Sequence, residues 1–274
     1  MKKIPWLVHG FSARAGGLTT CYADRSLNLG FTKEDVRERV ERNRRLFLLA
    51  LGAATQGKPW PLIINRQVHS DVVHVVRTPG STQLTGDGLV TNIPGVALAV
   101  LTADCFPVLL VDKKIRVVGA FHAGWRGTVQ RIVEKGVGAM RREYGSRPQD
   151  IYAAIGPGIQ KCCYAVGEEV KNEFESQFAY ARELFHEVKE SDPVREKYPL
   201  LFMNARPPGH GDTCVRLHLD LCEANRRQLL ATGVPEKQIS VVEGCTACDT
   251  RRFFSYRAEK GRTGRMMAVV GIAP

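Results

Sequence analysis

The sequence predicts a single α/β domain spanning residues 1–274. Short apolar runs of strand length alternate along the whole chain with longer stretches in which apolar residues recur at helical spacing. No linker, internal repeat or low-complexity segment is long enough to mark a boundary between two domains. Because 44% of the 274 residues are apolar, the chain can bury a substantial core.

The first half of the chain combines one clear helix with several strands. The helix is predicted because Val36, Val40, Phe47 and Leu51 recur at helical spacing, and Gly52 follows as a C-terminal stop. The strands are predicted from short apolar runs bounded by turn residues. In order, the expected elements are a strand over 6–11, a glycine-containing loop over 12–17, a helix over 35–51, two strands within 61–76 around a connection at 67–71, a turn at 86–88 and a buried strand over 96–101.

The second half continues the same alternation. Two apolar runs on either side of a basic turn at Lys113 and Lys114 are each of strand length. A glycine-rich turn after the second run leads into a helix whose apolar residues face one side. The expected elements after it are a helix over 128–144, a strand ending at 155, a helix over 174–188, a helix over 216–231 and two strands over 239–242 and 266–272.

Side chains that can take part in catalysis or metal binding concentrate between residues 102 and 128. Asp104 and Cys105 begin the first apolar run, His122 ends the second, and Arg126 stands in the glycine-rich turn. Polar groups buried among apolar strands are costly unless each has a partner, so this cluster favours a functional site. The alternative is structural: a buried thiol that behaves as a small apolar group, beside a core histidine with satisfied hydrogen bonds.

A third residue of the same kind strengthens the functional interpretation. His69 lies near the end of the apolar run at 61–64, in a segment far from Cys105 in the sequence. Structural zinc sites usually take four ligands from closely spaced pairs, whereas catalytic zinc keeps three protein ligands and leaves one position open. His69, Cys105 and His122 therefore predict an open metal site.

Several motifs resemble the laccase-domain family, whose members were first called polyphenol oxidases and later assigned as purine nucleoside phosphorylases. The most specific are Gln-Val-His-Ser at 67–70, Leu-Thr-Ala-Asp-Cys-Phe-Pro at 101–107 and His-Ala-Gly-Trp-Arg-Gly at 122–127. Further matching segments follow in order over nearly the whole chain, at 10–17, 27–30, 43–44, 86–91, 155–159 and 253–257.

The resemblance implies a fold, a metal and an activity. The fold would have mixed sheets packed together with helices on the outer faces. A zinc ion, or copper as the alternative, would be held by the residues matching His69, Cys105 and His122. The activity would be phosphorolysis of adenosine, inosine and methylthioadenosine, together with adenosine deamination. At Ala165 the chain departs from the family, which has a glutamate there, so no proton-transfer role of that glutamate is transferred to this chain.

Four further residues receive expected roles. Asp104 and Cys105 would point to opposite faces of a regular strand, so Asp104 is expected first to orient a metal ligand and second to act as an acid or base. Arg14 is expected to contact an anion or ribose, and Asn28, in the matching segment 27–30, is assigned to substrate binding as well. Arg126, beside the start of a helix, is placed to bind phosphate if its side chain turns inward. The equal alternative is a glycine-rich turn that serves only the passage from strand to helix.

Three other functions compete with the zinc nucleoside enzyme. A thiolate and two imidazoles also suit copper, and thus a laccase-like polyphenol oxidase, but a multicopper cluster needs more than seven histidines and His-x-His pairs, which this chain lacks. Cys105 could instead be the nucleophile of a metal-free hydrolase with a histidine as base. A binding protein without catalysis is the fourth alternative.

Composition limits the partners and the compartment. The net charge of +11 is spread in pairs of basic residues, many near glutamates, which is typical of solvated helix faces and does not predict specific nucleic-acid binding. No long apolar segment predicts a membrane span, and the first residues lack a signal-peptide pattern, so a cytoplasmic protein with reduced thiols is expected. Small-molecule nucleoside and phosphate are the expected partners, whereas the sequence does not predict the oligomeric state.

The eight cysteines do not form the disulfide pattern of a small secreted domain. The adjacent pair Cys162 and Cys163 is interpreted as an accident of packing. Cys245 and Cys248 have the spacing of half a zinc ribbon or of a redox pair, but no second Cys-x-x-Cys is present to complete a ribbon. Metal binding by these cysteines is therefore not expected from the sequence.

Overall fold

The computed structural model describes residues 4–79, 84–191, 194, 197–202 and 213–274. The chain groups into two compact units, one made of Met1–Gln160 with Leu221–Pro274 and the other of Lys161–Asp220. All three proposed metal ligands belong to the first unit. Whether residues 1–274 act as one catalytic domain stays a prediction.

The first unit contains two mixed sheets. The four-stranded sheet has the order β1 (Leu7–Phe11), β16 (Met266–Ile272), β8 (Ala97–Thr102) and β5 (Leu62–Ile64). The six-stranded sheet has the order β15 (Ile239–Val241), β11 (Ile151–Ile155), β9 (Phe106–Asp112), β10 (Val117–Ala123), β7 (Gly88–Thr91) and β6 (Val73–Val75). Antiparallel pairs form the centre of each sheet, while β5, β6 and β15 pair in parallel with their neighbours.

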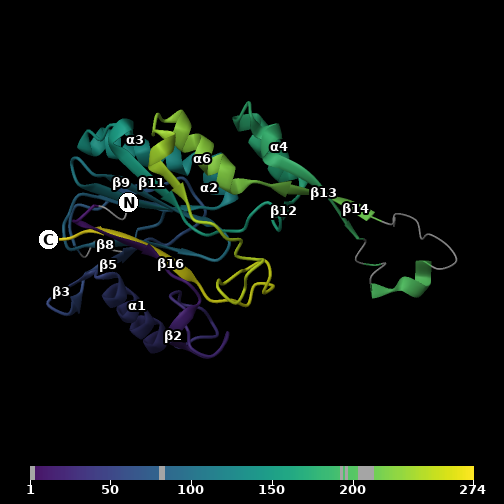
Figure 1. Cartoon of the computed structure of the whole chain (residues 1–274), viewed down its shortest axis with the longest axis horizontal. Helices are drawn as coiled ribbons and strands as arrows, with labels where there is room; N and C mark the ends of the chain where they lie inside the picture. Colours follow the sequence, from purple (N-terminus) through teal and green to yellow (C-terminus); the bar gives the residue numbers. More distant parts are fainter. Residues whose placement is uncertain (1–3, 80–83, 192–193, 195–196, 203–212) are drawn as a thin grey trace. The chain divides into compact units, whose positions relative to one another are not determined.

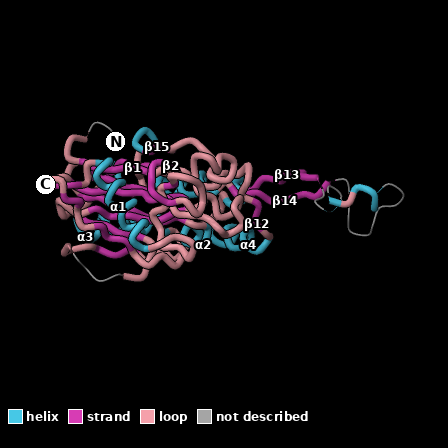
Figure 2. The backbone as a smooth tube through the Cα atoms, turned by 90° about the horizontal axis from the view of Figure 1, so that it is seen from below, coloured by secondary structure: helices cyan, strands magenta, loops and turns pink. Residues whose placement is uncertain are grey.

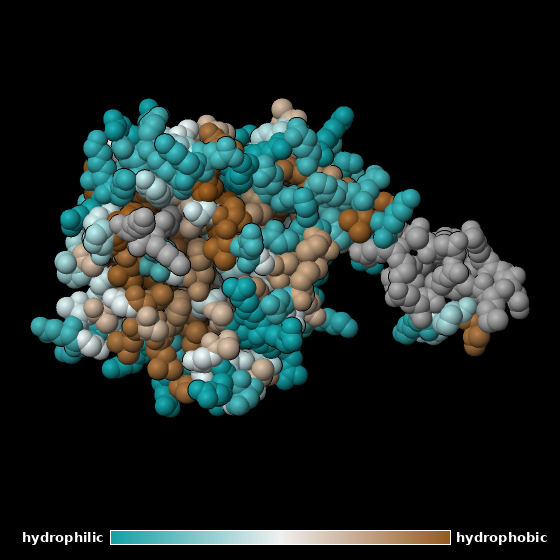
Figure 3. All heavy atoms as spheres, viewed as in Figure 1, coloured by the Kyte–Doolittle hydropathy of each residue, from teal (hydrophilic) through white to brown (hydrophobic). Residues whose placement is uncertain are grey.

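The two sheets pack together, and helices cover their outer faces (Figure 1). A core of valine, leucine, isoleucine and alanine from β7, β8, β9, β10 and β16 fills the space between the sheets. On one side α1 (Arg37–Leu51) buries Phe47 and Leu48 against β8 and β16. On the other side lie α3 (Ile132–Tyr144) and α6 (Leu221–Ala231), and mostly hydrophilic residues gather over α3 (Figure 3). These layers confirm the predicted α/β fold class.

Burial on both faces explains the continuous apolar runs in the sequence. Every residue of β9 and β10 is buried, because one face meets the other sheet and the opposite face meets helices. The helix expected over 128–144 is divided into α2 (Trp125–Val129) and α3. Arg131 between them has a φ angle of 67°, which the right-handed helix excludes, so the chain changes direction there.

Loops and turns make up much of the backbone between the longer elements (Figure 2), and several short elements lie among them. They are β2 (Ala15–Thr19), the small hairpin of β3 (Ala54–Thr55) and β4 (Lys58–Pro59), and the 3₁₀ turns η1 (Pro148–Asp150) and η4 (Glu236–Gln238). Among the described residues no helix is both long and apolar enough to cross a membrane.

The second unit corrects two predicted elements. It contains a three-stranded sheet in the order β12 (Ala165–Val166), β14 (Thr213–Leu219) and β13 (Phe185–Ser191), with α4 (Glu168–Gln177), η2 (Ala181–Leu184) and η3 (Pro199–Phe202). The predicted helix over 174–188 is wrong, because α4 ends before Phe178 and the chain then enters β13. The helix over 216–231 begins only at Leu221, since residues before it pair with β13.

Candidate metal centre

His69, Cys105 and His122 come together in the structure. One ligand atom from each lies within 4.8 Å of the others. The Cys105 Sγ is 3.9 Å from the His69 Nε2, and the two imidazole rings meet edge to face with centroids 4.9 Å apart. A thiolate and two imidazoles are ligand types of both zinc and copper, so this donor set fits a metal with one position left for water or substrate.

The pairing of β9 with β10 places two of these ligands at the same end of the two strands. Strands β9 and β10 pair so that Ala123 lies opposite Phe106, which brings Cys105, just before β9, next to Gly124, just after β10. His122 is the penultimate residue of β10, and its backbone N–H donates to the Asp87 carbonyl at 2.8 Å. His69 belongs to the connection between β5 and β6.

Two residues of the site have unusual backbone angles. His69 has a φ angle of 61° and Asp104 a φ angle of 90°. Residues other than glycine rarely adopt positive φ angles. Such conformations persist where the surrounding structure holds them, and they cluster at functional sites. Here they turn the chain sharply just before Cys105. Asp104 and Cys105 are therefore not successive residues of a regular strand, as the prediction of opposite faces assumed.

Asp87 connects two of the three ligands. Its Oδ1 accepts a hydrogen bond from His122 Nδ1 at 2.8 Å and one from the His69 backbone N–H at 3.0 Å. Its Oδ2 accepts from the backbone N–H and the hydroxyl of Ser70. A histidine that donates Nδ1–H to a carboxylate presents the Nε2 lone pair to a metal. Asp87 therefore fixes the ring of His122 and the loop of His69 together.

Charges within the site shift three pKa values. Burial opposes the charged form of Cys105, but His122 and hydrogen bonds from both histidines outweigh it and lower the pKa of the thiol to about 6. Burial also opposes the imidazolium of His122, yet the Cys105 thiolate and Asp87 raise its pKa to about 9. Burial raises the pKa of Asp87, but hydrogen bonds from His122 and Ser70 outweigh it and lower that pKa. The site thus favours the thiolate that metals bind.

Asp104 supports the cysteine rather than a histidine. Its Oδ1 accepts a hydrogen bond from the Thr246 hydroxyl at 2.6 Å, and its Oδ2 accepts one from the Arg257 backbone N–H at 2.7 Å. The Asp104 carbonyl accepts from the backbone N–H of Ile159 at 2.8 Å. These bonds fix the turn that carries Cys105. The carboxylate that orients a histidine is that of Asp87, for which the sequence predicts only a turn between two glycines.

Arg14 and Asn28 make extensive contacts within the protein. The buried guanidinium of Arg14 donates to the carbonyls of Thr250 and Tyr22 and to the Glu259 carboxylate, all at 2.8–2.9 Å. Asn28 is completely buried, and its amide nitrogen donates to the Gly30 carbonyl and to Asp35. These contacts are typical of residues that hold loops together, and a substrate-binding role for either residue stays a prediction.

Arg126 differs from Arg14 in exposure. It lies in α2, directly after Trp125, and its guanidinium carbon is 4.5 Å from the centre of the Trp125 ring. The side chain is exposed, and Arg126 follows Gly124 by two positions. An exposed arginine stacked on an aromatic ring keeps its N–H donors available to an anion. Phosphate binding by Arg126 stays a prediction.

Gly124 leaves the space that the ligands occupy, which leads to a testable prediction. A Cβ atom at this position would lie 3.0 Å from Cys105 Sγ and 3.0 Å from His69 Cδ2. Gly124→Ala should therefore push both ligands aside and weaken metal binding about tenfold, since metal sites require ligands placed within about 0.5 Å. Metal affinity measured by competition with a chelator checks this.

Gly138→Ala is the matched control, because a Cβ there meets nothing within 4 Å. Alanine inside α3 should leave metal affinity unchanged and raise stability by about 0.5–1 kcal/mol. Equal metal affinity in the two variants would contradict the assigned contact.

Comparison with known proteins identifies the family. The sequence model of the family described as multi-copper polyphenol oxidoreductase laccase matches residues 8–273. The chain belongs to this family. It is 39% identical to a purine nucleoside phosphorylase of Deinococcus radiodurans, over 96% of this chain and 88% of that protein. It is 35% identical to adenosine deaminase RL5 from an unknown prokaryotic organism, over 74% of this chain and 72% of that protein.

A solved structure agrees with these sequence relationships. The crystal structure of YlmD from Geobacillus stearothermophilus superposes with a TM-score of 0.77 and 33% sequence identity, covering 99% of this chain and 93% of that one. The family is copper-oxidase-like and metal-binding, and this chain has a site of two histidines and a cysteine that suits a metal. The fold and family inferred from the sequence motifs are thus confirmed.

Proposed function

We propose that this protein is a zinc-dependent purine nucleoside phosphorylase that cleaves adenosine, inosine and methylthioadenosine and also deaminates adenosine. The names of the relatives support both activities. The observation that carries the proposal for this chain is the convergence of His69, Cys105 and His122 at an edge of the sheet, with His122 oriented by Asp87. Cytoplasmic location stays a prediction.

The three ligands provide an open site. A zinc ion bound by them would supply Lewis acidity and lower the pKa of bound water toward about 7. The residues of the chain set its position: Asp87 holds the His122 ring, and Asp104 holds the turn of Cys105. Gly124 keeps the space beside the ligands free of a side chain. Deamination at purine C6 requires such a Lewis acid beside the ring.

Phosphorolysis makes a different demand on the protein. A phosphate oxygen forms a bond to the sugar carbon C1′ while the bond from C1′ to the purine nitrogen breaks. The proton that hydrogen phosphate loses balances the one that the departing purine gains. The sugar carries positive charge during this step, so a phosphate held at close range both reacts and stabilises it. Arg126, exposed in α2 and four residues after His122, is the residue we assign to holding that phosphate.

The experiment that tests this function follows products with and without phosphate. Purified, zinc-loaded protein given adenosine and phosphate should release adenine and a ribose phosphate in equal amounts. Given adenosine without phosphate, it should release only inosine and ammonia. Absence of base release and of inosine with fully loaded protein would remove the proposal.

Copper oxidase activity is the second candidate, favoured by the family description and by the two-histidine, one-cysteine donor set. Metal content measured by mass spectrometry, alongside a phenol oxidation assay with zinc-loaded and copper-loaded protein, separates the two. We expect zinc in the protein as purified and nucleoside turnover with it. Phenol oxidation that exceeds nucleoside turnover would favour the oxidase.

Arg126→Ala is expected to raise the KM for phosphate about tenfold or more, because one charge-assisted contact to an anion contributes about 1.5–3 kcal/mol. Deamination of adenosine, which uses no phosphate, should change little. Steady-state kinetics at varied phosphate concentration measures this. Arg45→Ala is the control, because it removes the same charge. Arg45 is exposed on α1, in the opposite outer layer. An unchanged phosphate KM in Arg126→Ala would contradict the assignment.

A further inference from the structure

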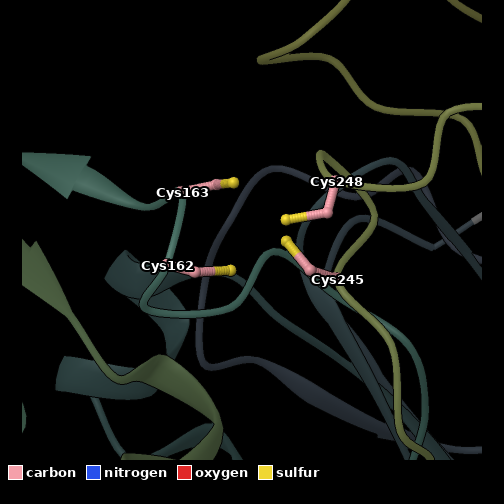
Figure 4. A group of neighbouring side chains, drawn as sticks. All are labelled: Cys162, Cys163, Cys245 and Cys248. Atoms are coloured by element: carbon pink, nitrogen blue, oxygen red, sulfur yellow. The ribbon is translucent and has the colours of Figure 1, made fainter.

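Two cysteines in the segment that follows β15 form a close pair of thiols. Cys245 and Cys248 both belong to the first unit, and their Sγ atoms lie within 4.8 Å of each other. Their side chains point toward each other (Figure 4), and no disulfide joins them in the structure. The Cys-x-x-Cys spacing is that of a redox pair, and the three-ligand metal centre uses neither cysteine.

A turn of helical type places the two cysteines on one side of the backbone. The backbone N–H of Asp249 donates to the Cys245 carbonyl at 3.1 Å, which is the hydrogen bond of one α-helical turn. Residues three apart on such a turn have Cβ atoms about 5–6 Å apart. A disulfide joins Cβ atoms about 3.5–4.5 Å apart. The two thiols are therefore close enough to be joined, but the turn must tighten by about 1 Å.

The two thiols differ in exposure, which suits a reaction in two steps. Cys248 is exposed, so a small reagent can reach its sulfur, whereas Cys245 is buried. The backbone N–H of Gln160 donates to the Cys245 Sγ at 3.3 Å, and such a bond stabilises a thiolate. An accessible thiol that reacts first, beside a second thiol that completes the disulfide, is the arrangement of a redox-sensitive pair.

The turn between the two cysteines carries a residue that supports the metal centre. Thr246 follows Cys245 directly and donates its hydroxyl to the Asp104 carboxylate at 2.6 Å. Asp104 has the unusual φ angle of 90° and precedes Cys105 in the chain. A tightening of the turn by about 1 Å is enough to break this bond, because oxygen atoms about 3.6 Å apart no longer form a hydrogen bond.

A second support of Asp104 also depends on Cys245. Ile159 donates its backbone N–H to the Asp104 carbonyl at 2.8 Å. The residue after it, Gln160, donates to the Cys245 Sγ, and Gly158 pairs with Cys245 in a parallel bridge. Hydrogen bonds to a charged acceptor are stronger than those to a neutral one, so a disulfide sulfur holds this N–H less firmly than a thiolate does. Oxidation of Cys245 therefore weakens both supports.

We propose that Cys245 and Cys248 form a reversible disulfide and that this disulfide weakens metal binding at the centre of His69, Cys105 and His122. The first part stands on the thiol pair alone. The second part rests on the proposed metal-dependent function, because it concerns the same centre. The path from the disulfide to the metal runs through the turn that precedes Cys105.

A low-molecular-weight disulfide, such as oxidised glutathione, is the oxidant in this reaction. The Cys248 thiolate attacks one sulfur of the reagent, whose S–S bond breaks and releases the first thiol. The Cys245 thiolate then attacks the Cys248 sulfur, which forms the bond within the protein and releases the second thiol. The protein loses two electrons and two protons, and the reagent gains them. Because the closed turn is strained, a small dithiol reduces the bond again.

Peptide mapping tests the first part of the proposal. Whole protein is incubated with excess oxidised glutathione in the presence of zinc, the remaining thiols are alkylated, and the peptides are identified by mass spectrometry. We expect a disulfide between Cys245 and Cys248 that dithiothreitol removes. Unchanged thiols at these two positions, or a disulfide from either of them to a different cysteine, would overturn the proposal.

Competition with a chelator tests the second part by measuring zinc affinity in the reduced and the oxidised protein. Oxidation should weaken zinc binding about tenfold or more, as is usual when a residue that supports a metal ligand is lost. Thr246→Val removes only the hydroxyl that Asp104 accepts, so its affinity should already be lowered in the reduced protein. Oxidation should then lower it further by a smaller factor than in wild type.

Cys248→Ser separates the disulfide from direct damage to the metal ligand. The position is exposed, so reduced Cys248→Ser should bind zinc as tightly as reduced wild type, and the oxidant should not change that affinity. Cys21→Ser is the matched control and should respond as wild type does, because Cys21 is outside the pair. Loss of zinc from oxidised Cys248→Ser would assign the effect to Cys105 itself and overturn the proposal.

Two further outcomes distinguish this inference from the proposed function. If reduced wild type bound no metal, the proposed function would fail together with the second part, while the mapped disulfide would still support the first. If reduced and oxidised wild type bound zinc equally, the second part would fail alone, and the proposed function would be unaffected.

Discussion

His122→Ala should reduce kcat/KM for adenosine about a thousandfold or more. The variant loses one of three ligands, and its partners Cys105 and His69 cannot hold the ion alone. Lewis-acid stabilisation contributes several kcal/mol to a transition state, and each 1.36 kcal/mol is a factor of ten in rate. Removing the imidazole also leaves the buried carboxylate of Asp87 without one of its hydrogen-bond donors. Metal content and steady-state kinetics on the same preparation check both effects.

His74→Ala is the control for this variant. His74 lies in β6 and its Nε2 is 2.8 Å from the Thr85 carbonyl, so it resembles His122 in residue type but not in its neighbours. Its replacement should leave metal content and kcat/KM within about a factor of three of wild type. Full activity in His122→Ala would show that the chemistry does not use this centre and would leave Cys105 chemistry without metal as the alternative.

The strands of the first unit could be predicted from the sequence because their cause is local. Strands β8, β9, β10 and β16 are buried on both faces, so each reads as an unbroken apolar run. The strands of the second unit do not read as unbroken apolar runs. Strand β14 pairs with β13 over seven residues, although a helical pattern was expected to cover its second half from Arg216. Strand pairing across distant segments overrides the periodicity of short stretches, which cannot separate strand from helix.

The candidate site shows the same division between local and distant causes. The residue types of Cys105, His69 and His122 suggested metal ligands, and the structure brings their atoms together. The role of Asp87 was missed because Gly-Asp-Gly is an ordinary turn sequence. Its function depends on which donors surround the carboxylate, and those donors come from segments around 69 and 122. Only the folded chain reveals such a partner.

Asp87→Asn should weaken metal binding by about 10- to 100-fold, as is usual when the partner of a metal-bound histidine is lost. The amide oxygen of asparagine can still accept the hydrogen bonds of one carboxylate oxygen, but its NH₂ group would face N–H or O–H donors of Ser70 or His122. The buried carboxylate also serves the His69 backbone, so we expect unfolding free energy to fall by about 1–3 kcal/mol. Competition with a chelator and thermal unfolding measure the two effects.

Asp112→Asn separates loss of metal from loss of stability. Asp112 is also buried, and its Oδ1 accepts hydrogen bonds from the backbone N–H groups of Lys114 and Ile115 at the far end of β9. It should therefore lower stability by a similar amount while metal affinity stays unchanged. If both variants lost metal equally, general loosening of the sheet would explain the result. Weaker binding in Asp87→Asn alone would assign the effect to the orientation of His122, because only that carboxylate fixes the ring.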